Sequence, residues 1–319
     1  MNNYTFIDYK PVQNTFEDDI LIGLQENPKR ISPKYFYDER GSELFTRICE
    51  LDEYYPTRTE TSILKDHIES ISKALGHSPF IIEYGSGTSE KIKSLLRETT
   101  GKASYMALDI SKEFLIQSTQ QLAEEFPRIV VYAVCTDYSK PTQLPEFCKY
   151  RENKIIYFPG SSFGNFNTSE QHAFLKNTRK NLNVGEKFLI GLDLVKSTEV
   201  LERAYNDFFG VTEAFNKNVL VRMNRELDTN FNIDEFKHIA FFNPKESRIE
   251  MHLESKINQY VRIHQKDILF EKGERIHTEN SYKFHTANTE RFFLQHNFKL
   301  NALWTDKQTY FGIFLFEAI

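Results

Sequence analysis

The stretch PFIIEYGSGTSEKIKSLL, residues 79–96, contains the turn around which the fold is organised. Residues 79–84 form a short and mostly apolar run, and residues 90–96 carry apolar side chains at helical spacing. Between them, Gly85 and Gly87 let the backbone approach a ligand closely, and the start of the helix presents unpaired N–H groups. The stretch therefore predicts a strand, a ligand-binding turn and a helix in succession.

Strand-like and helix-like segments continue to alternate after this turn. Such alternation is typical of a parallel sheet with crossover helices. Ligands of these sheets bind beyond the carboxyl ends of the strands, so the polar and acidic residues at those ends mark the candidate site. We expect further strands at 103–108, 129–134, 154–158 and 187–194, with a helix at 112–126.

The C-terminal segment has a different pattern. Residues 298–304 and 310–316 read as two strands, and the five residues between them are too few to contain a crossover helix. The two strands must therefore be antiparallel. A parallel sheet finished by an antiparallel hairpin is typical of S-adenosylmethionine (SAM)-dependent methyltransferases, whereas a nicotinamide-binding Rossmann domain normally ends with another parallel strand.

Two segments fall outside this alternation and predict a second domain. Residues 198–281 interrupt the α/β pattern, and 248–257 alternate with period two like a half-exposed strand. We expect 1–61 and 198–281 to form a discontinuous, α+β, substrate-binding domain that caps the carboxyl edge. Residues 62–197 and 282–319 would then form a Rossmann-like SAM-binding domain of the α/β class.

Composition excludes several classes of partner. The 319 residues include 40 Lys+Arg and 45 Asp+Glu, and a net charge of -5 argues against binding to duplex nucleic acid. The chain lacks a run of ~20 apolar residues, so we expect no membrane segment. Three cysteines without CxxC spacing and nine histidines without an HxxxH pair predict no metal. We expect a cytoplasmic monomer that acts on a small molecule.

Acidic residues at two strand ends fit a nucleoside cofactor. Asp109 lies 24 residues beyond Gly85, where a carboxylate can accept both ribose hydroxyls. Asp137 follows the next strand, and Tyr138 beside it could stack on adenine. Either acid alone could instead be a helix cap or a turn residue. The glycine turn departs from GxGxxG, which disfavours a pyrophosphate cradle. The glycine turn, the two acids at strand ends and the reversed hairpin together favour SAM.

Longer strings carry a more specific likeness. The strings are YFYDERGSELF (35–45), LDEYYPTRTE (51–60), EYGSGTSEK (83–91) and FPGSSFGN (158–165), followed by VTEAFN (211–216) and TENS (278–281). They resemble the histidine Nα-methyltransferase family, which uses SAM to trimethylate L-histidine to hercynine in the first step of ergothioneine biosynthesis. The family also contains relatives that act on tryptophan derivatives, so the resemblance leaves the aromatic substrate open.

The resemblance implies two sets of site residues. Those around the cofactor would be Tyr37, Phe45, Gly85, Lys91, Asp109, Asp137 and Tyr138. Those around the amino acid would be Tyr54, Asn165, Tyr205, Met251, Glu279 and Ser281. Tyr37 is also the candidate for contact with the reacting amine, although water could accept the proton that the amine loses.

The second set suits histidine chemically. Asn165 and Tyr205 can donate hydrogen bonds to a carboxylate, and Glu279 can accept the N–H of a neutral imidazole. Ser281, two residues further along an extended segment, lies on the same face and can exchange a hydrogen bond with the ring. With Met251 as a soft wall, the pocket favours histidine over tryptophan, because a charged Glu279 beside indole carbon would be costly.

Simpler structural roles remain open for the same residues. Tyr54 and Met251 could belong to the core, Glu279 and Ser281 could be solvated, and Asn165 could serve only a turn. Three other functions also remain: a tryptophan-type N-methyltransferase, a nicotinamide-dependent oxidoreductase and a SAM-binding protein without activity. A substrate panel distinguishes the tryptophan-type enzyme, and protection by the cofactor in thermal unfolding distinguishes the oxidoreductase. Turnover distinguishes the inactive SAM-binding protein.

Overall fold

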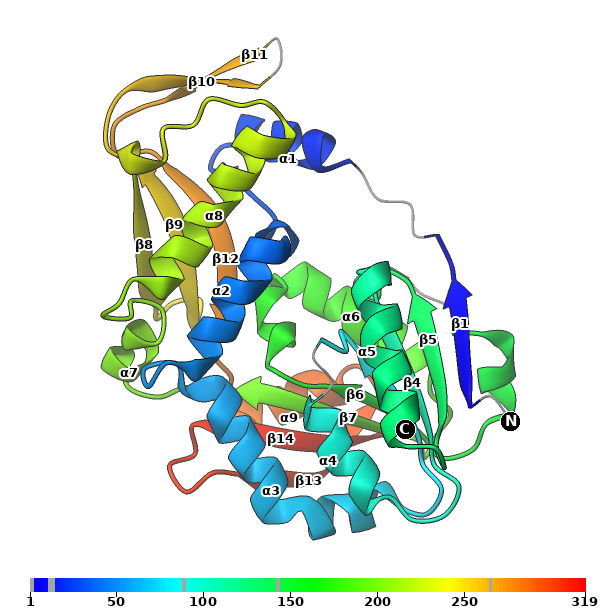
Figure 1. The fold of residues 1–319 in the computed structure, drawn as a ribbon. Helices are drawn as coiled ribbons and strands as arrows, with labels where there is room; N and C mark the ends of the chain where they lie inside the picture. Colours follow the sequence, from blue (N-terminus) through cyan, green and yellow to red (C-terminus); the bar gives the residue numbers. More distant parts are fainter. Residues whose placement is uncertain (1–2, 11–14, 88–89, 142–143, 264–265) are drawn as a thin grey trace. The chain divides into compact units, whose positions relative to one another are not determined.

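A computed structural model describes residues 3–10, 15–87, 90–141, 144–263 and 266–319. The chain divides into two compact units (Figure 1). Unit 1 consists of residues 1–12, 58–194 and 284–319, and unit 2 consists of residues 13–57 and 195–283. Thr88 and Ser89 of the glycine turn lie outside the described residues.

Unit 1 is built on an eight-stranded sheet with the order β1-β5-β4-β3-β6-β7-β14-β13. The strands from β1 to β7 in this order pair in parallel, as the alternating sequence pattern predicts. The strands are β1 (Tyr4–Asp8), β3 (Phe80–Tyr84), β4 (Ser104–Asp109), β5 (Val130–Cys135), β6 (Lys154–Phe158), β7 (Lys187–Asp193), β13 (Phe298–Thr305) and β14 (Phe311–Ala318).

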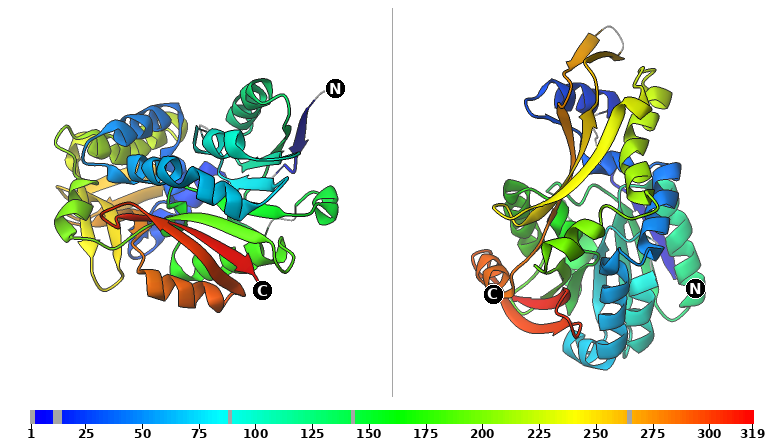
Figure 2. Two further views of the ribbon diagram at one scale, coloured as in Figure 1. Left: turned by 90° about the horizontal axis from the view of Figure 1, so that it is seen from below. Right: turned by 90° about the vertical axis from the view of Figure 1, so that its left-hand side faces the viewer.

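Helices cover both faces of this sheet (Figure 2), because alternate side chains of each strand point to opposite faces. In β3, Ile81 joins one apolar core with residues of α3, α4 and α5, while Phe80 and Ile82 join the other core with residues of α6 and α9. The helices are α3 (Tyr55–Leu75), α4 (Glu90–Glu98), α5 (Lys112–Glu125), α6 (Thr168–Lys180) and α9 (Thr286–Leu294), with 3-10 turns η2 (Glu146–Tyr150) and η3 (Ser162–Asn165).

The predicted C-terminal hairpin is confirmed. β13 and β14 are antiparallel, and β14 also pairs antiparallel with β7. The last strand of the chain therefore lies between β7 and β13 and closes the sheet in the reversed arrangement expected of SAM-dependent methyltransferases.

The N-terminus differs from the expected domain boundary. The sequence pattern predicts residues 1–61 to belong to the second domain, but β1 pairs in parallel with β5, and residues 1–12 belong to unit 1. The Asn3 amide reinforces this edge by donating to the Ala123 and Ile129 carbonyls at 3.0 Å each. A five-residue edge strand gives little signal in sequence, since its apolar side chains do not alternate clearly.

Unit 2 is α+β, as the sequence predicts. It contains a four-stranded sheet of order β2-β12-β9-β8 and a separate β10-β11 pair. Its strands are β2 (Lys29–Arg30), β8 (Phe236–Asn243), β9 (Arg248–Ser255), β10 (Gln259–Ile263), β11 (Lys266–Phe270) and β12 (Arg275–Tyr282). Its helices are α1 (Phe16–Gln25), α2 (Glu39–Glu50), α7 (Thr198–Arg203) and α8 (Val211–Glu226), with 3-10 turns η1 (Pro33–Phe36) and η4 (Ile233–Glu235).

A β-bulge in β12 decides which side chains face α8. His277 pairs with His252 of β9, but Glu279 pairs with the very next residue, Met251. Thr278 is the extra residue, and its hydroxyl lies 2.8 Å from Asn216 Oδ1 of α8. Because residues 251 and 252 face opposite sides of the sheet, the bulge turns Glu279 to the face opposite His277.

Among the helices that the structure describes, none is long and apolar enough to cross a membrane. The cytoplasmic location and the monomeric state expected from sequence stay predictions.

Candidate functional site

The glycine turn after β3 is shaped by close contact with an aromatic ring. Gly85 and Gly87 have φ values of +69° and +46°, which favour glycine. A Cβ atom at Gly85 would lie only 2.8 Å from the Tyr138 hydroxyl. In the same turn, the buried Ser86 hydroxyl has no hydrogen-bond partner among the described residues. A buried polar atom of this kind, in a turn held close to a ring, fits a loop that receives a polar ligand.

The two acids predicted to bind a nucleoside lie at the same sheet edge. Asp109 ends β4, opposite Cys135 at the end of β5, and Asp137 follows two residues later. Asp109 accepts the Ser111 N–H at 2.9 Å, and Asp137 accepts the Ser139 N–H at 3.1 Å. Burial raises the pKa of Asp109 against the lowering effect of its hydrogen bonds, among them the one from the Ser111 N–H. Both acids therefore also stabilise the following turns, the alternative role that sequence left open.

Lys91, expected at the cofactor, is held by a buried carboxylate. Its ammonium pairs with Glu60 of α3, and both Glu60 oxygens lie 3.0 Å from the Gly160 N–H. Glu60 is completely buried, and Gly191 of β7 leaves room for it, since a Cβ there would lie 2.1 Å from Glu60 Oε1. Sequence reasoning did not single out Glu60. The signal available in sequence was that Glu60 lies one helical turn before the apolar residues Ile63 and Leu64, which are buried.

The acidic residue that opens the EYGSG turn is itself deeply buried. Burial, together with the neighbouring Glu60 and Asp109, raises the pKa of Glu83 to about 8 against the lowering effects of the Tyr105 hydrogen bond and Lys91. The Tyr105 hydroxyl donates to Glu83 Oε2 at 2.5 Å. At neutral pH this group therefore carries a proton most of the time, which reduces the cost of burying it next to the glycine turn.

Asn165 lies in unit 1, although sequence grouped it with the substrate residues. It ends η3, the short turn that follows β6. Ser161 at the start of this turn has φ +58° and its hydroxyl accepts the Asp193 N–H at 2.9 Å. This bond links the loop after β6 to the end of β7. Unit 1 thus contains Gly85, Lys91, Asp109, Asp137, Tyr138 and Asn165 along the carboxyl edge of one sheet.

In unit 2, aromatic residues of the two predicted sets contact one another. The ring of Tyr37 lies 5.6 Å from that of Phe45, which lies 6.3 Å from Tyr54. Tyr54 in turn lies 6.2 Å from Tyr205. Burial keeps the pKa of Tyr54 well above its usual value, so its phenol stays protonated. The predicted cofactor residues Tyr37 and Phe45 are therefore continuous with the predicted substrate residues Tyr54 and Tyr205.

The other substrate residues lie on one face of the unit 2 sheet. Glu279 pairs with Met251, and Ser281 pairs with Ile249 on the same strand. Burial raises the pKa of Glu279 to about 7, and the positive charge of Lys283 lowers it. No hydrogen bond to the Glu279 carboxyl is found among the described residues. The carboxyl therefore can serve as an acceptor for an N–H group of a ligand.

Tyr205 and Ser281 meet at a lysine that sequence reasoning missed. The Tyr205 hydroxyl donates to Ser281 Oγ at 2.8 Å, and the Lys283 ammonium donates to the same atom at 2.7 Å. Lys283 is only 3% exposed. The signal available in sequence was its position, two residues after Ser281 and four after Glu279 on an extended segment. Since the Tyr205 proton points to Ser281, the expected donation from Tyr205 to a carboxylate requires this hydroxyl to rotate.

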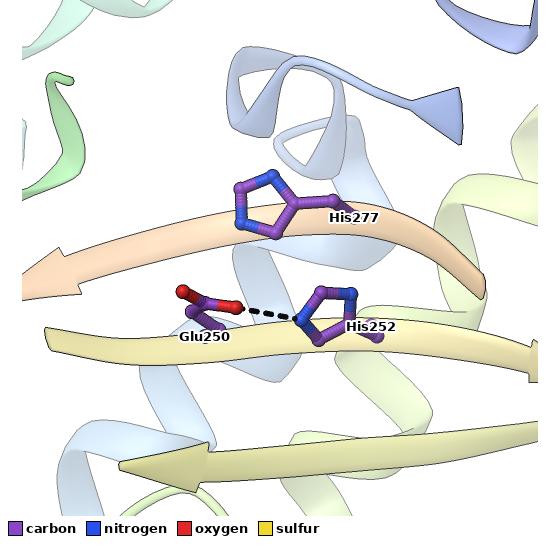
Figure 3. Close-up of side chains that lie close together, drawn as sticks. All are labelled: Glu250, His252 and His277. Carbon is purple, nitrogen blue, oxygen red and sulfur yellow. Dashed lines mark hydrogen bonds and ion pairs between the residues drawn. The ribbon is translucent and has the colours of Figure 1, made fainter. Parts of the chain in front are cut away.

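Glu250, His252 and His277 gather on the opposite face of the same sheet (Figure 3). Sequence predicted no metal from the lack of an HxxxH pair, and this trio is assembled from two strands. Each side chain already has a protein partner: Glu250 pairs with Arg248 at 2.7 Å and with His252 at 3.2 Å, and His277 Nε2 lies 2.9 Å from Asn280 Oδ1. The second ring nitrogen of His252 has no partner among the described residues, whereas metal-bound histidines normally have one. We therefore interpret the trio as a structural network.

Comparisons with known proteins show which family the chain is similar to. A family model described as "Histidine-specific methyltransferase, SAM-dependent" matches residues 16–318. A histidine N-alpha-methyltransferase from Mycolicibacterium smegmatis is 38% identical over 303 residues, covering 93% of both chains. One from Mycobacterium tuberculosis is 36% identical with the same coverage. Ergothioneine biosynthesis protein 1 from Neurospora crassa is 30% identical, covering 88% of this chain and 32% of that protein.

The position of Glu60 predicts a steric effect at Gly191. The substitution Gly191→Ala places a methyl group against Glu60 Oε1 and should lower the free energy of unfolding by about 1–3 kcal/mol. Chemical denaturation measures this loss. In an E60A background the same change should cost clearly less, because the clashing atom is gone. If Gly191→Ala lowers the free energy of unfolding equally with and without Glu60, the contact between residue 191 and Glu60 is contradicted.

The buried histidines predict a loss of stability in acid. Burial lowers the pKa of His252 to about 4, from 6.5 for the free side chain. Between these values the unfolded chain binds a proton that the folded chain does not, so stability is full above about pH 6.5 and falls as the pH drops towards 4. Burial also lowers the pKa of His277 and of His238, with the same sign.

Denaturation midpoints at pH 7.5 and pH 5 measure this effect. The variant H252Q should lose less stability on acidification than the unmodified protein, by about 1–2 kcal/mol. The control is H285Q, because His285 is exposed. An acid loss that stays the same in H252Q would show that His252 is not responsible.

Proposed function

We infer that this protein, which belongs to the family of histidine-specific, SAM-dependent methyltransferases, methylates the α-amino group of L-histidine. The fold is that of a SAM-dependent methyltransferase, with a mostly parallel sheet and a reversed C-terminal hairpin. The observation that supports the substrate best is Glu279, a buried carboxyl that the Thr278 bulge brings to the face of Met251. An acceptor beside an apolar side chain suits an imidazole ring.

The proposed cofactor residues fit SAM by the chemistry of their groups. Gly85 and Ser86 provide a close backbone turn with a polar atom, and Asp109 provides an acceptor for ribose hydroxyls. Tyr138 provides an aromatic surface, and Asp137 provides an acceptor beside it. Lys91 supplies positive charge suited to the cofactor carboxylate. Tyr37 and Phe45 stay in the proposed set on the family resemblance.

The proposed substrate residues divide by polarity. Glu279 accepts the ring N–H, Ser281 donates to the other ring nitrogen and Met251 packs against the flat ring. Asn165 donates to the carboxylate, while Tyr205 keeps its hydrogen bond to Ser281 and supports the ring end of the site. Tyr54 contacts the amine region as a phenol, since its raised pKa makes it a hydrogen-bonding group rather than a base. The proton of the reacting ammonium then leaves to water, or through Tyr37, a residue that is 43% exposed.

SAM supplies an electrophilic methyl group: the amine lone pair forms the new C–N bond while the C–S electrons stay on sulfur. The protein contributes mainly by positioning, which can lower a barrier by ~7–11 kcal/mol. We propose three successive transfers that yield hercynine, the first step of ergothioneine biosynthesis. Each transfer removes an N–H donor, so recognition has to depend on the carboxylate and ring ends of the substrate.

The first test is mass spectrometry of the purified protein incubated with SAM and an equimolar panel of the twenty amino acids. A histidine product heavier by three methyl groups is expected, because Glu279 can pair with an imidazole N–H. A single-methyl product would contradict the repeated transfer. Methylated tryptophan in place of methylated histidine would overturn the role of Glu279.

Removing the ring acceptor should affect histidine selectively. The substitution Glu279→Ala is expected to raise the KM for histidine about 10- to 100-fold, since a hydrogen bond to a charged group is lost. The KM for SAM should change little. Steady-state kinetics measure both constants, and E246A, at an exposed glutamate of the same unit, is the control. An unchanged KM for histidine would exclude Glu279 from ring recognition.

A further inference from the structure

Lys283 completes a small hydrogen-bonded cluster with two proposed substrate residues. Its ammonium donates to Ser281 Oγ at 2.7 Å and to the Tyr205 hydroxyl at 3.2 Å. The ammonium also lies 5.0 Å from the centre of the Tyr205 ring. All three side chains are at least 94% buried. A buried charge is costly to maintain, so the Lys283 ammonium depends on these hydrogen bonds.

The cluster fixes the direction of the Ser281 hydroxyl. A serine hydroxyl has one hydrogen to donate and two lone pairs to accept with. An ammonium group can only donate, so Lys283 occupies one lone pair of Ser281 Oγ. The Tyr205 hydroxyl donates to the other at 2.8 Å. Ser281 then has no accepting capacity left, and its own hydrogen has to point to a group outside the cluster.

A donor fixed beside an acceptor matches a ring with two different nitrogens. Glu279 and Ser281 follow the bulge on one face of β12, and side chains two residues apart on a strand stand about 6.6 Å apart. A ring with two nitrogens can bridge this separation through two hydrogen bonds of about 2.8 Å each. Neutral imidazole offers one N–H and one bare nitrogen, whereas indole offers only an N–H.

We propose that Lys283 is a positioning residue that, together with Tyr205, makes Ser281 an obligate hydrogen-bond donor to the bare ring nitrogen of the substrate. Lys283 thereby determines specificity for a ring that carries both a donor and an acceptor. This inference rests on the proposed function, since it takes Glu279 and Ser281 as the residues that meet the ring. It adds a residue that acts through Ser281 and need not touch the substrate.

The test compares histidine with L-β-(2-thienyl)alanine, whose five-membered ring has neither an N–H nor a bare nitrogen. The ratio of kcat/KM for the two substrates measures ring discrimination. In the variant K283M the Ser281 hydroxyl is free to turn away, so this ratio should fall about tenfold. The loss should appear in the KM for histidine, with the kcat and the KM for SAM little changed.

A double-mutant cycle distinguishes positioning from a general structural role. S281A alone should lower the discrimination ratio. In alkaline buffer, where Glu279 stays ionised without the Lys283 charge, adding K283M to S281A should lower the ratio no further, because Lys283 then acts only through Ser281. K283Q restores an uncharged donor and should recover part of the ratio. The control is K256M in the same unit, whose exposed lysine donates to the Asp234 carbonyl. An increase in the unfolding temperature on addition of SAM shows that a variant is folded. If K283M does not fold, the discrimination ratio of K283Q is used to test the role of Lys283.

Each remaining outcome has a separate meaning. If the unmodified protein does not methylate histidine, the proposed function fails whatever Lys283 does. If it methylates histidine but K283M keeps the full discrimination ratio, only the positioning role is overturned. If K283M loses discrimination against histidinamide but not against thienylalanine, Lys283 acts at the carboxylate end, and the assignment to the ring is wrong.

Discussion

The buried carboxylate of Glu60 is the interaction on which the predicted cofactor region of unit 1 depends. It accepts the Gly160 N–H, pairs with Lys91 and occupies the space that Gly191 leaves open. A single side chain of α3 thereby joins the start of α4, the loop after β6 and the adjacent strand β7. A buried carboxylate is stable only with such partners, because an unpaired charge in the interior is expensive. The requirement for these partners fixes the three segments against one another.

Other carboxyl groups show how burial alone changes chemistry. Glu83 and Glu279 have pKa values of about 8 and about 7, mainly because desolvation disfavours their charged forms. Glu83 accepts a hydrogen bond from Tyr105 and lies directly before the glycine turn. Glu279 instead makes no hydrogen bond among the described residues and remains able to receive a substrate N–H. The two acids thus share a physical cause but differ in partners, and the partners determine their roles.

The sheet of unit 2 shows how one inserted residue separates two environments. Before the bulge at Thr278, His277 belongs to the face with Glu250 and His252; after it, Glu279 and Ser281 belong to the face with Met251. Without the extra residue, strict alternation would place the proposed ring-binding acid among the histidines and Arg248. Substrate recognition in this proposal therefore depends on backbone register as much as on side-chain identity.

Sequence by itself determined the main sheet, because periodicity and the glycine turn are local signals: the strands ending near Gly85, Asp109 and Asp137 and the reversed hairpin all follow from short segments. The family strings then supplied the candidate site residues, whose roles stay predictions. Tertiary structure alone decided the partners of those residues. The pairing of β1 with β5, the Glu60 pair, the Thr278 bulge and the Lys283 cluster join segments far apart in the chain or depend on register. No local pattern encodes such contacts, because burial and hydrogen-bond partners exist only once the chain has folded.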